Sequence, residues 1–340
     1  MCVLQKYDIL GWRNMIEKIQ EIVAPYEVTV REIELITKGF LSENFKVVCD
    51  EGVFFLKQYR AEIDQQRIED IHKSKNYFAA NGIPVVMPIA NARGDFFVAR
   101  GGRFFSLFPF VNGHTYPDQH CSMAELRSLA RMLARVHSAG ALAGERHINK
   151  AFEQKKQDGA RLHAEAVIAA IEREILRTGG SEFDRSALAI AQRKYEWILA
   201  WPFESSVELP SILVHHDLHA GNVFFDDAAE IRHVFDFELT QYEPAAFDVV
   251  RIMTIVCMDY GLREEKWDRV HNFVEAYRGV RALEDDELRA GVAQFVTYRS
   301  TSFWVEEEHY LKNNSRVDRF LECDEESRLM WIEWLEQSGL

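Results

Sequence analysis

The chain carries Val-His-His-Asp-Leu-His-Ala-Gly-Asn-Val-Phe-Phe-Asp-Asp at residues 214–227 and, shortly after it, Val-Phe-Asp-Phe-Glu at residues 234–238. The apolar runs 212–214, 223–225 and 233–235 have the length and composition of short β-strands. The polar residues between these runs therefore fall on turns, where side chains can act on a ligand. Helical spacing surrounds this strand island on both sides, so the island decides how the rest of the chain is interpreted.

Three residues of the island have the types and the order that phosphoryl transfer to a hydroxyl needs. That reaction uses a carboxylate to orient and deprotonate the hydroxyl, and oxygen ligands to hold magnesium on a triphosphate. The protein-kinase pattern has an Asn five positions after the catalytic Asp, and a second, metal-binding Asp beyond a short hairpin. Asp217, Asn222 and Asp236 reproduce that order and the first spacing. Gly221 suits a loop that turns tightly around a metal.

Two other interpretations of the same loop compete with this one. One is a transition-metal site, as in His-Asp phosphohydrolases, formed by four potential ligands within five positions, namely His215, His216, Asp217 and His219. Those enzymes are helical around their His-Asp pair, whereas strand-like runs flank it here. The other is a polar turn with a buried, hydrogen-bonded histidine, which leaves Asn222 and the later Asp-Phe-Glu unexplained.

The two parts of the chain differ in their hydrophobic periodicity. Helices are expected at 10–26 and 62–80, and beyond Pro109 the spacing is mainly helical. The strands of the first part are expected at 28–35, 45–47, 53–56, 85–90, 95–99 and 104–108. We therefore expect an α+β, two-lobed fold, with a small antiparallel sheet in residues 1–108 and a larger helical lobe in 109–340. The cleft between two such lobes is the usual ligand site.

A third motif, Glu-Pro-Ala-Ala-Phe-Asp-Val-Val-Arg at residues 243–251, follows at a matching distance. With all three motifs the chain resembles the aminoglycoside phosphotransferase family, a superfamily that also includes choline, homoserine, fructosamine and methylthioribose kinases. The resemblance covers most of the chain and is sharpest at 211–251. It implies the bilobal protein-kinase-like fold. His216 is the one departure, because it stands where the family usually has Gly.

The resemblance also implies a role for each residue that matches the family's motifs. Asp217 is the expected catalytic base, and Asn222 and Asp236 are the expected ligands of Mg²⁺. Four further residues are expected to brace the loop, to bind metal or substrate, or to tie the helical lobe to the loop. These supporting residues are His215, His219, Glu238 and Asp248.

For the nucleotide, the resemblance implies a phosphate-covering loop and a phosphate-binding lysine in the small lobe. The loop residues expected to bind ATP are Lys38, Gly39, Ser42 and Asn44. Lys57, at the end of an apolar strand, is expected to reach the α- and β-phosphates. Its acidic partner on the following helix is either Glu69 or Asp70, with Glu69 favoured. The hinge that reads the adenine edge is expected at Phe108 and Phe110.

Composition limits the partners and the compartment. The net charge of −14 argues against binding to nucleic acid and is compatible with a cationic acceptor. No run of residues approaches the roughly 18 apolar residues of a membrane helix, and the first residues do not form a signal peptide. The five scattered cysteines fit a reducing compartment. We expect a cytoplasmic protein without a membrane partner, either a monomer or a homodimer.

The expected function is ATP-dependent transfer of the γ-phosphate to a hydroxyl of a small molecule, which can be an amino alcohol, a sugar or an aminoglycoside. The acidic segment 298–310 is the expected acceptor-binding helix. Two alternatives belong to other classes: a catalytically silent kinase-like binding protein, and a protein Ser/Thr kinase.

Overall fold

The computed structural model describes residues 9–36, 44–116, 121–144, 154–200, 209–258 and 263–337. The chain forms two compact units, each with its own hydrophobic cluster. The first unit comprises Met1–His114 and Arg232–Glu238, and the second comprises Thr115–Ile231 and Leu239–Leu340. Part of the strand island therefore belongs to the first unit. The division into residues 1–108 and 109–340, expected from the sequence, does not include the return of Arg232–Glu238 to the first unit.

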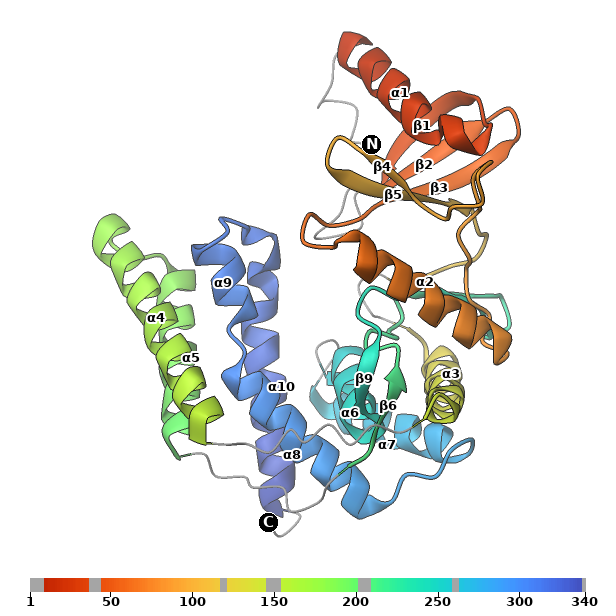
Figure 1. Cartoon of the computed structure of the whole chain (residues 1–340). Helices are drawn as coiled ribbons and strands as arrows, with labels where there is room; N and C mark the ends of the chain where they lie inside the picture. The colour runs from red at the N-terminus through yellow and green to blue at the C-terminus, as the bar shows by residue number, and fades with distance from the viewer. Residues whose placement is uncertain are drawn as a thin grey trace. The chain divides into compact units, whose positions relative to one another are not determined.

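The first unit is built on a five-stranded antiparallel sheet in the order β1-β2-β3-β5-β4 (Figure 1). Its strands are β1 (Val30–Ile36), β2 (Asn44–Cys49), β3 (Gly52–Gln58), β4 (Val98–Arg100) and β5 (Arg103–Pro109). A two-residue turn sets the register of β4 and β5, where Arg100 lies opposite Arg103. Gly101 and Gly102 in this turn both have positive φ, 57° and 72°. Such a turn twists in the same sense as the strands that it joins.

Alternate residues of the strands and one side of a helix form the core of this unit. The helix is α1 (Ile9–Val23), which contacts β1 and continues into the short 3-10 helix η1 (Ala24–Tyr26). The core residues with almost no exposed surface are Ile19, Ile22, Val23, Val47, Leu56 and Leu107. Burial of each such side chain contributes about 1.5–3 kcal/mol. The second helix, α2 (Gln65–Ala80), begins at Asp64, whose carboxylate accepts a hydrogen bond from the Arg67 N–H.

The segment between α2 and β4 is less regular than its sequence predicts. The strand predicted at 85–90 is wrong, because the structure has only an isolated bridge there, between Val85 and Val234. Pro84 and Pro88 lack the N–H groups that a ladder of hydrogen bonds needs, which explains the difference. The strand predicted at 95–99 is also reduced, to β4.

The second unit is mainly helical, and its helices pack in pairs: α3 on α7, α6 on α8, and α4 on α5 (Figure 1). The helices are α3 (Met123–Leu142), α4 (Gln154–Thr178), α5 (Glu182–Ala200), α6 (Ala245–Met253), α7 (Arg263–Arg278), α8 (Asp285–Thr301), α9 (Trp304–Tyr310) and α10 (Leu321–Gln337). A π-helical turn, η2 (Thr254–Met258), follows α6, and a 3-10 helix, η3 (Ser315–Phe320), precedes α10. Among the described helices, none offers the long uncharged apolar stretch that crosses a lipid bilayer.

The strand island consists of β6 (Ser211–Val214), β7 (Val223–Phe225), β8 (Ile231–Val234) and β9 (Gln241–Pro244). The first three match the predicted strands. The fourth was not predicted, because its polar sequence and terminal proline give little strand signal. It pairs antiparallel with β6, so that Val214 lies opposite Gln241. The predicted class, a small antiparallel sheet with a larger helical part, is confirmed.

Helix α3 passes so close to β6 that only glycine fits at one position. A Cβ atom on Gly140 would lie 1.9 Å from the backbone oxygen of Leu213. The obstacle is backbone of a paired strand and cannot move aside as a flexible side chain would. This close approach sets the distance between α3 and the strand that leads into the loop at residues 215–222.

Gly140→Ala should therefore lower the free energy of unfolding by about 1–3 kcal/mol, the usual cost of overpacking. Gly159→Ala on the exposed part of α4 is the matched control, since a Cβ there meets nothing within 4 Å. The control should gain about 0.5–1 kcal/mol, because alanine favours the helix over glycine. Urea unfolding of both variants measures the difference, and equal effects would contradict the close approach.

Candidate active site

The loop that follows β6 holds Asp217 through the residues on either side of it. His215 is fully buried, and its Nδ1 accepts a hydrogen bond from the Asp217 N–H at 3.2 Å. The Asn222 side-chain amide donates to the Asp217 backbone oxygen and to its Oδ2, both at 2.9 Å. The Asp217 side chain keeps 23% of its surface exposed. The carboxylate is therefore fixed at its base while it stays open to a ligand.

His215 and His219 accept hydrogen bonds from backbone N–H groups of the same loop. His219 Nδ1 accepts a hydrogen bond from the Gly221 N–H at 3.0 Å, and its Nε2 lies 3.5 Å from Asp217. His215 bonds the backbone at Asp217, as described above. In the described part of the chain, no three His, Cys, Asp or Glu side chains converge as metal ligands. The loop geometry thus gives no support to the transition-metal interpretation.

Asp217 lies among basic side chains. Burial pushes the pKa of its carboxyl up, but His219, Arg251 and His215 outweigh burial and bring the pKa below its usual range. Arg251, on α6, places its Nη2 3.6 Å from Asp217 Oδ1. At neutral pH the carboxyl is therefore ionised and accepts hydrogen bonds.

His216 has a left-handed backbone, with φ of 67°. This conformation favours glycine, which explains why Gly suits the position and what a side chain there must overcome. The His216 ring stacks on Phe247, with 6.1 Å between ring centres and planes 6° apart. The backbone oxygen of His216 accepts a hydrogen bond from Arg251 Nε at 2.9 Å. These contacts hold the strained residue next to Asp217.

Asp248 is completely buried on α6 and ties the loop to two other helices. Its Oδ2 accepts a hydrogen bond from His137 Nε2 on α3 at 2.9 Å. The other ring nitrogen of His137 lies 2.8 Å from the Tyr277 hydroxyl on α7. His216 Nδ1 lies 3.8 Å from Asp248 Oδ1. The family resemblance implies this supporting role for Asp248. It assigned no role to Arg251, the last residue of the third motif, and His137 and Tyr277 lie in no motif.

A second charged cluster lies within the first unit, around Lys57 on β3. The Lys57 ammonium lies 2.8 Å from Asp236 Oδ1 and 2.8 Å from Glu238 Oε1. Arg60 Nε donates to the other oxygen of Glu238 at 3.1 Å. Burial lowers the pKa of Lys57, but the two carboxylates more than offset this and raise it above its usual value. The lysine is therefore positively charged at neutral pH.

The acid partners of Lys57 correct the prediction that α2 supplies one. Glu69 accepts a hydrogen bond from Gln65 at 2.9 Å within its own helix, and Asp70 lies 3.0 Å from Lys73. Both acids fall on the outer face of α2, whereas its inner face carries apolar residues, His72 and Lys75. Spacing alone did not reveal that Asp236 and Glu238, far along the chain, take this role.

The other predicted nucleotide-binding residues have different surroundings. Asn44 begins β2 directly opposite Lys57. Phe108 is buried and packs edge-on against Phe55, so its ring belongs to the core. Phe110 is 37% exposed, with Lys46 over its ring. Lys38, Gly39 and Ser42 lie outside the described residues.

The acidic segment 298–310 is not one helix but the end of α8 followed by α9. Two of its acidic residues contact basic side chains of other helices. Glu306 is buried and lies 3.4 Å from Lys194, and Glu307 accepts a hydrogen bond from His163 at 2.7 Å. These contacts connect α9 with α4 and α5.

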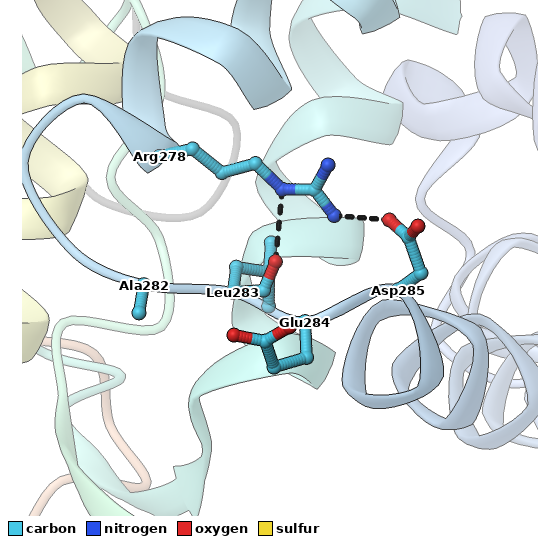
Figure 2. A pocket seen from close by; sticks show the side chains of 5 residues that line it. All are labelled: Arg278, Ala282, Leu283, Glu284 and Asp285. Carbon is cyan, nitrogen blue, oxygen red and sulfur yellow. Dashed lines mark hydrogen bonds and ion pairs between the residues drawn. The ribbon is translucent and has the colours of Figure 1, made fainter.

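A shallow pocket at the turn between α7 and α8 is lined by Arg278, Ala282, Leu283, Glu284 and Asp285. Figure 2 shows that Arg278 reaches across it to the Leu283 carbonyl and the Asp285 carboxylate. The guanidinium thus closes the helix-to-helix turn, and its polar groups are used within the pocket.

Replacing His216 separates the cost of its backbone conformation from the value of its side chain. His216→Gly and His216→Ala both remove the stacking on Phe247, but only alanine is strained at φ of 67°. The Gly variant should therefore be about 1 kcal/mol more stable than the Ala variant. Thermal unfolding of the two proteins measures this, and equal stability would contradict a left-handed residue 216.

A sequence-family profile described as the phosphotransferase enzyme family matches residues 32–289, which is most of the chain. Homoserine kinase of Parvibaculum lavamentivorans is 24% identical over 281 residues, covering 81% of this chain and 79% of the relative. Homoserine kinase of Polaromonas naphthalenivorans is 26% identical over 275 residues, covering 78% and 80% respectively.

Solved structures show the same fold. A microcompartment-associated aminopropanol kinase aligns with a TM-score of 0.60 and 15% identity, over 96% of this chain and 99% of its own. An aminoglycoside phosphotransferase from Alicyclobacillus acidocaldarius aligns with a TM-score of 0.59 and 14% identity, over 94% and 95%. The fold of the chain is thus that of the protein-kinase-like phosphotransferases, as the sequence predicts.

Proposed function

The chain belongs to the phosphotransferase enzyme family, and we propose that it transfers the γ-phosphate of ATP to a hydroxyl group of a small amino alcohol. The observation that carries the proposal is the ionised carboxylate of Asp217, held on a braced turn and still partly exposed. Homoserine and aminopropanol, after which relatives are named, are both amino alcohols. Solved relatives with bound ADP or AMP-PNP favour an adenine nucleotide as the donor.

In the proposed reaction Asp217 accepts a hydrogen bond from the acceptor hydroxyl and points its oxygen at the γ-phosphorus. A bond forms between this oxygen and phosphorus, while the bond from phosphorus to the bridging oxygen of ADP breaks. The low pKa of Asp217 makes it a weak base, so the proton moves to the carboxylate late, as the new bond acidifies the hydroxyl. Orientation of the hydroxyl is then the main contribution of Asp217.

Asn222 and Asp236 are the proposed ligands of Mg²⁺. Magnesium prefers oxygen ligands, usually one or two carboxylates together with phosphate oxygens. The amide nitrogen of Asn222 is used by Asp217, which leaves its carbonyl oxygen as the atom for a cation. Asp236 and Glu238 supply carboxylates in the first unit. When bound, the metal ion neutralises charge that develops on the phosphates.

Lys57 is the proposed ligand of the α- and β-phosphates. Its ammonium group carries a full charge and is held by two carboxylates, so its direction is fixed before a nucleotide arrives. A phosphate group can share this charge without removing both carboxylates. Lys57 therefore acts by position and charge, and takes no part in proton transfer.

A set of small molecules tests the acceptor class. ADP release should be stimulated by homoserine or 3-amino-1-propanol, and not by propylamine, which lacks the hydroxyl. Propanol, which lacks the amine, should act only at much higher concentration. If sugars or aminoglycosides are phosphorylated and amino alcohols are not, the acceptor class proposed here is wrong.

Asp217→Asn should lower kcat by about 10²–10⁴-fold, the usual range for a general base. The binding of ATP should be retained, because Asn keeps the size of the side chain. Asp227→Asn is the matched control, as it changes an exposed acid on the following hairpin. Steady-state kinetics compare the two, and near-normal turnover in Asp217→Asn rules out the proposed role.

Asp236→Asn should abolish the effect of Mg²⁺ on nucleotide affinity. Asp236 has φ of 61°, a conformation that asparagine also tolerates, so the backbone should keep its shape. Calorimetric titration with ATP, with and without Mg²⁺, measures the effect. A magnesium dependence equal to that of the unchanged protein would remove Asp236 from the metal site.

A further inference from the structure

Lys75 lies on the inner face of α2 and is only 3% exposed. Its ammonium nitrogen donates a hydrogen bond to the backbone oxygen of Val86 at 3.0 Å. It also lies 4.5 Å from the ring centre of Phe108 and 5.3 Å from that of Phe237. Within the described ranges of the chain, Lys75 has no carboxylate as an ion-pair partner. Its ammonium group contacts one backbone carbonyl and two aromatic rings.

The surroundings of Lys75 disfavour its positive charge. Burial lowers the pKa of Lys75 to about 7, and the neighbouring ammonium of Lys57 acts in the same direction, while Asp236 and Glu238 oppose them. His72 on the same helix has a pKa lowered to about 4, by burial and by Lys75, and therefore adds no charge. A buried charge without a counter-ion costs stability, and a methionine would fill the same space without that cost. Stability therefore does not explain why a lysine occupies this position.

Lys75 is connected to residues on both sides of Asp236, through Val86 on one side and directly on the other. On one side, the N–H of Val86 donates to the backbone oxygen of Val234 at 2.9 Å, so the carbonyl that binds Lys75 belongs to a residue paired with the island. On the other side, the fully buried ring of Phe237 lies against the ammonium group. Asp236, in its left-handed conformation, lies between these two points.

We propose that Lys75 is a positioning residue, whose ammonium group holds the segment 232–238 in the shape that keeps Asp236 and Glu238 on Lys57. Its effect on catalysis rests on the proposed function. Its effect on the segment does not, because the contacts lie within the first unit and involve no substrate.

Lys75→Met tests this proposal, because it should raise stability and lower activity. The variant should unfold at a higher urea concentration than the unchanged protein at pH 7. Its advantage should shrink as the pH rises from about 7 towards 10.5, by up to tenfold in the unfolding constant per pH unit. Between these pH values Lys75 is neutral in the folded protein and takes up a proton when the protein unfolds. Because proton uptake becomes less favourable as the pH rises, the unchanged protein becomes relatively more stable.

The same variant should have a looser segment at 232–238. Hydrogen exchange of these amides, followed by mass spectrometry, should be several-fold faster than in the unchanged protein. The kcat for phosphoryl transfer should fall by about tenfold, as small displacements of a catalytic group do, and the KM for the acceptor should stay the same. A residue with a merely structural role would lower stability and activity together.

Lys194→Met is the matched control. Lys194 is also buried, donates to the Ser302 backbone oxygen at 2.9 Å and lies 5.1 Å from the ring centre of Phe303. Unlike Lys75, it has a carboxylate partner, Glu306 at 3.4 Å. Lys194→Met should therefore be less stable than the unchanged protein, with the same exchange at 232–238 and the same kcat.

Three results overturn the inference. Exchange at 232–238 that is unchanged in Lys75→Met removes the positioning role, and so does a loss of stability or of folding at pH 7. Faster exchange with an unchanged kcat refutes the link between the segment and catalysis. If the unchanged protein shows no acceptor-dependent phosphoryl transfer, the proposed function fails instead, and exchange and stability still decide the role of Lys75.

Discussion

Asp248 has no exposed surface, so its negative charge has to be satisfied inside the protein. His137 donates a hydrogen bond to it and is itself fixed by the hydroxyl of Tyr277. This chain of contacts connects α6 with α3 and α7, and it ends beside His216, the residue before Asp217. Asp248 thus joins the helices on which the loop rests, while His215 and Asn222 fix Asp217 directly. Loss of that acid would release the loop from the helices that support it.

Both functional loops contain a non-glycine residue in the left-handed region, His216 in one and Asp236 in the other. Such residues persist only where the surroundings hold them more firmly than the strain displaces them. Stacking on Phe247 and the hydrogen bond from Arg251 hold His216. The ion pair with Lys57 holds Asp236. In each loop the strain points a carboxylate in a fixed direction, which suits a reaction that depends on orientation.

Features formed by residues close together in the chain were predicted from the sequence, whereas contacts between residues far apart in the chain were not. The turn around Asp217 and Asn222 was predicted because its strands, spacing and residue types lie within a dozen positions. Asp236 and Glu238 were predicted as site residues, but their pairing with Lys57 was not, because they lie far along the chain from it and α2 offered nearer carboxylates. His137, Tyr277 and Lys75 gave no signal either, since a helix pattern reports which face is buried and not which side chains meet there.

Direct transfer of phosphate from ATP to a small hydroxylated molecule is the central step of the proposed function. The most direct measurement uses ATP labelled with ³²P in the γ-position, incubated with Mg²⁺, the protein and an amino alcohol. We expect label in a small organic product, in an amount equal to the ADP formed. Label recovered only as inorganic phosphate, or only on protein, with every acceptor would contradict it.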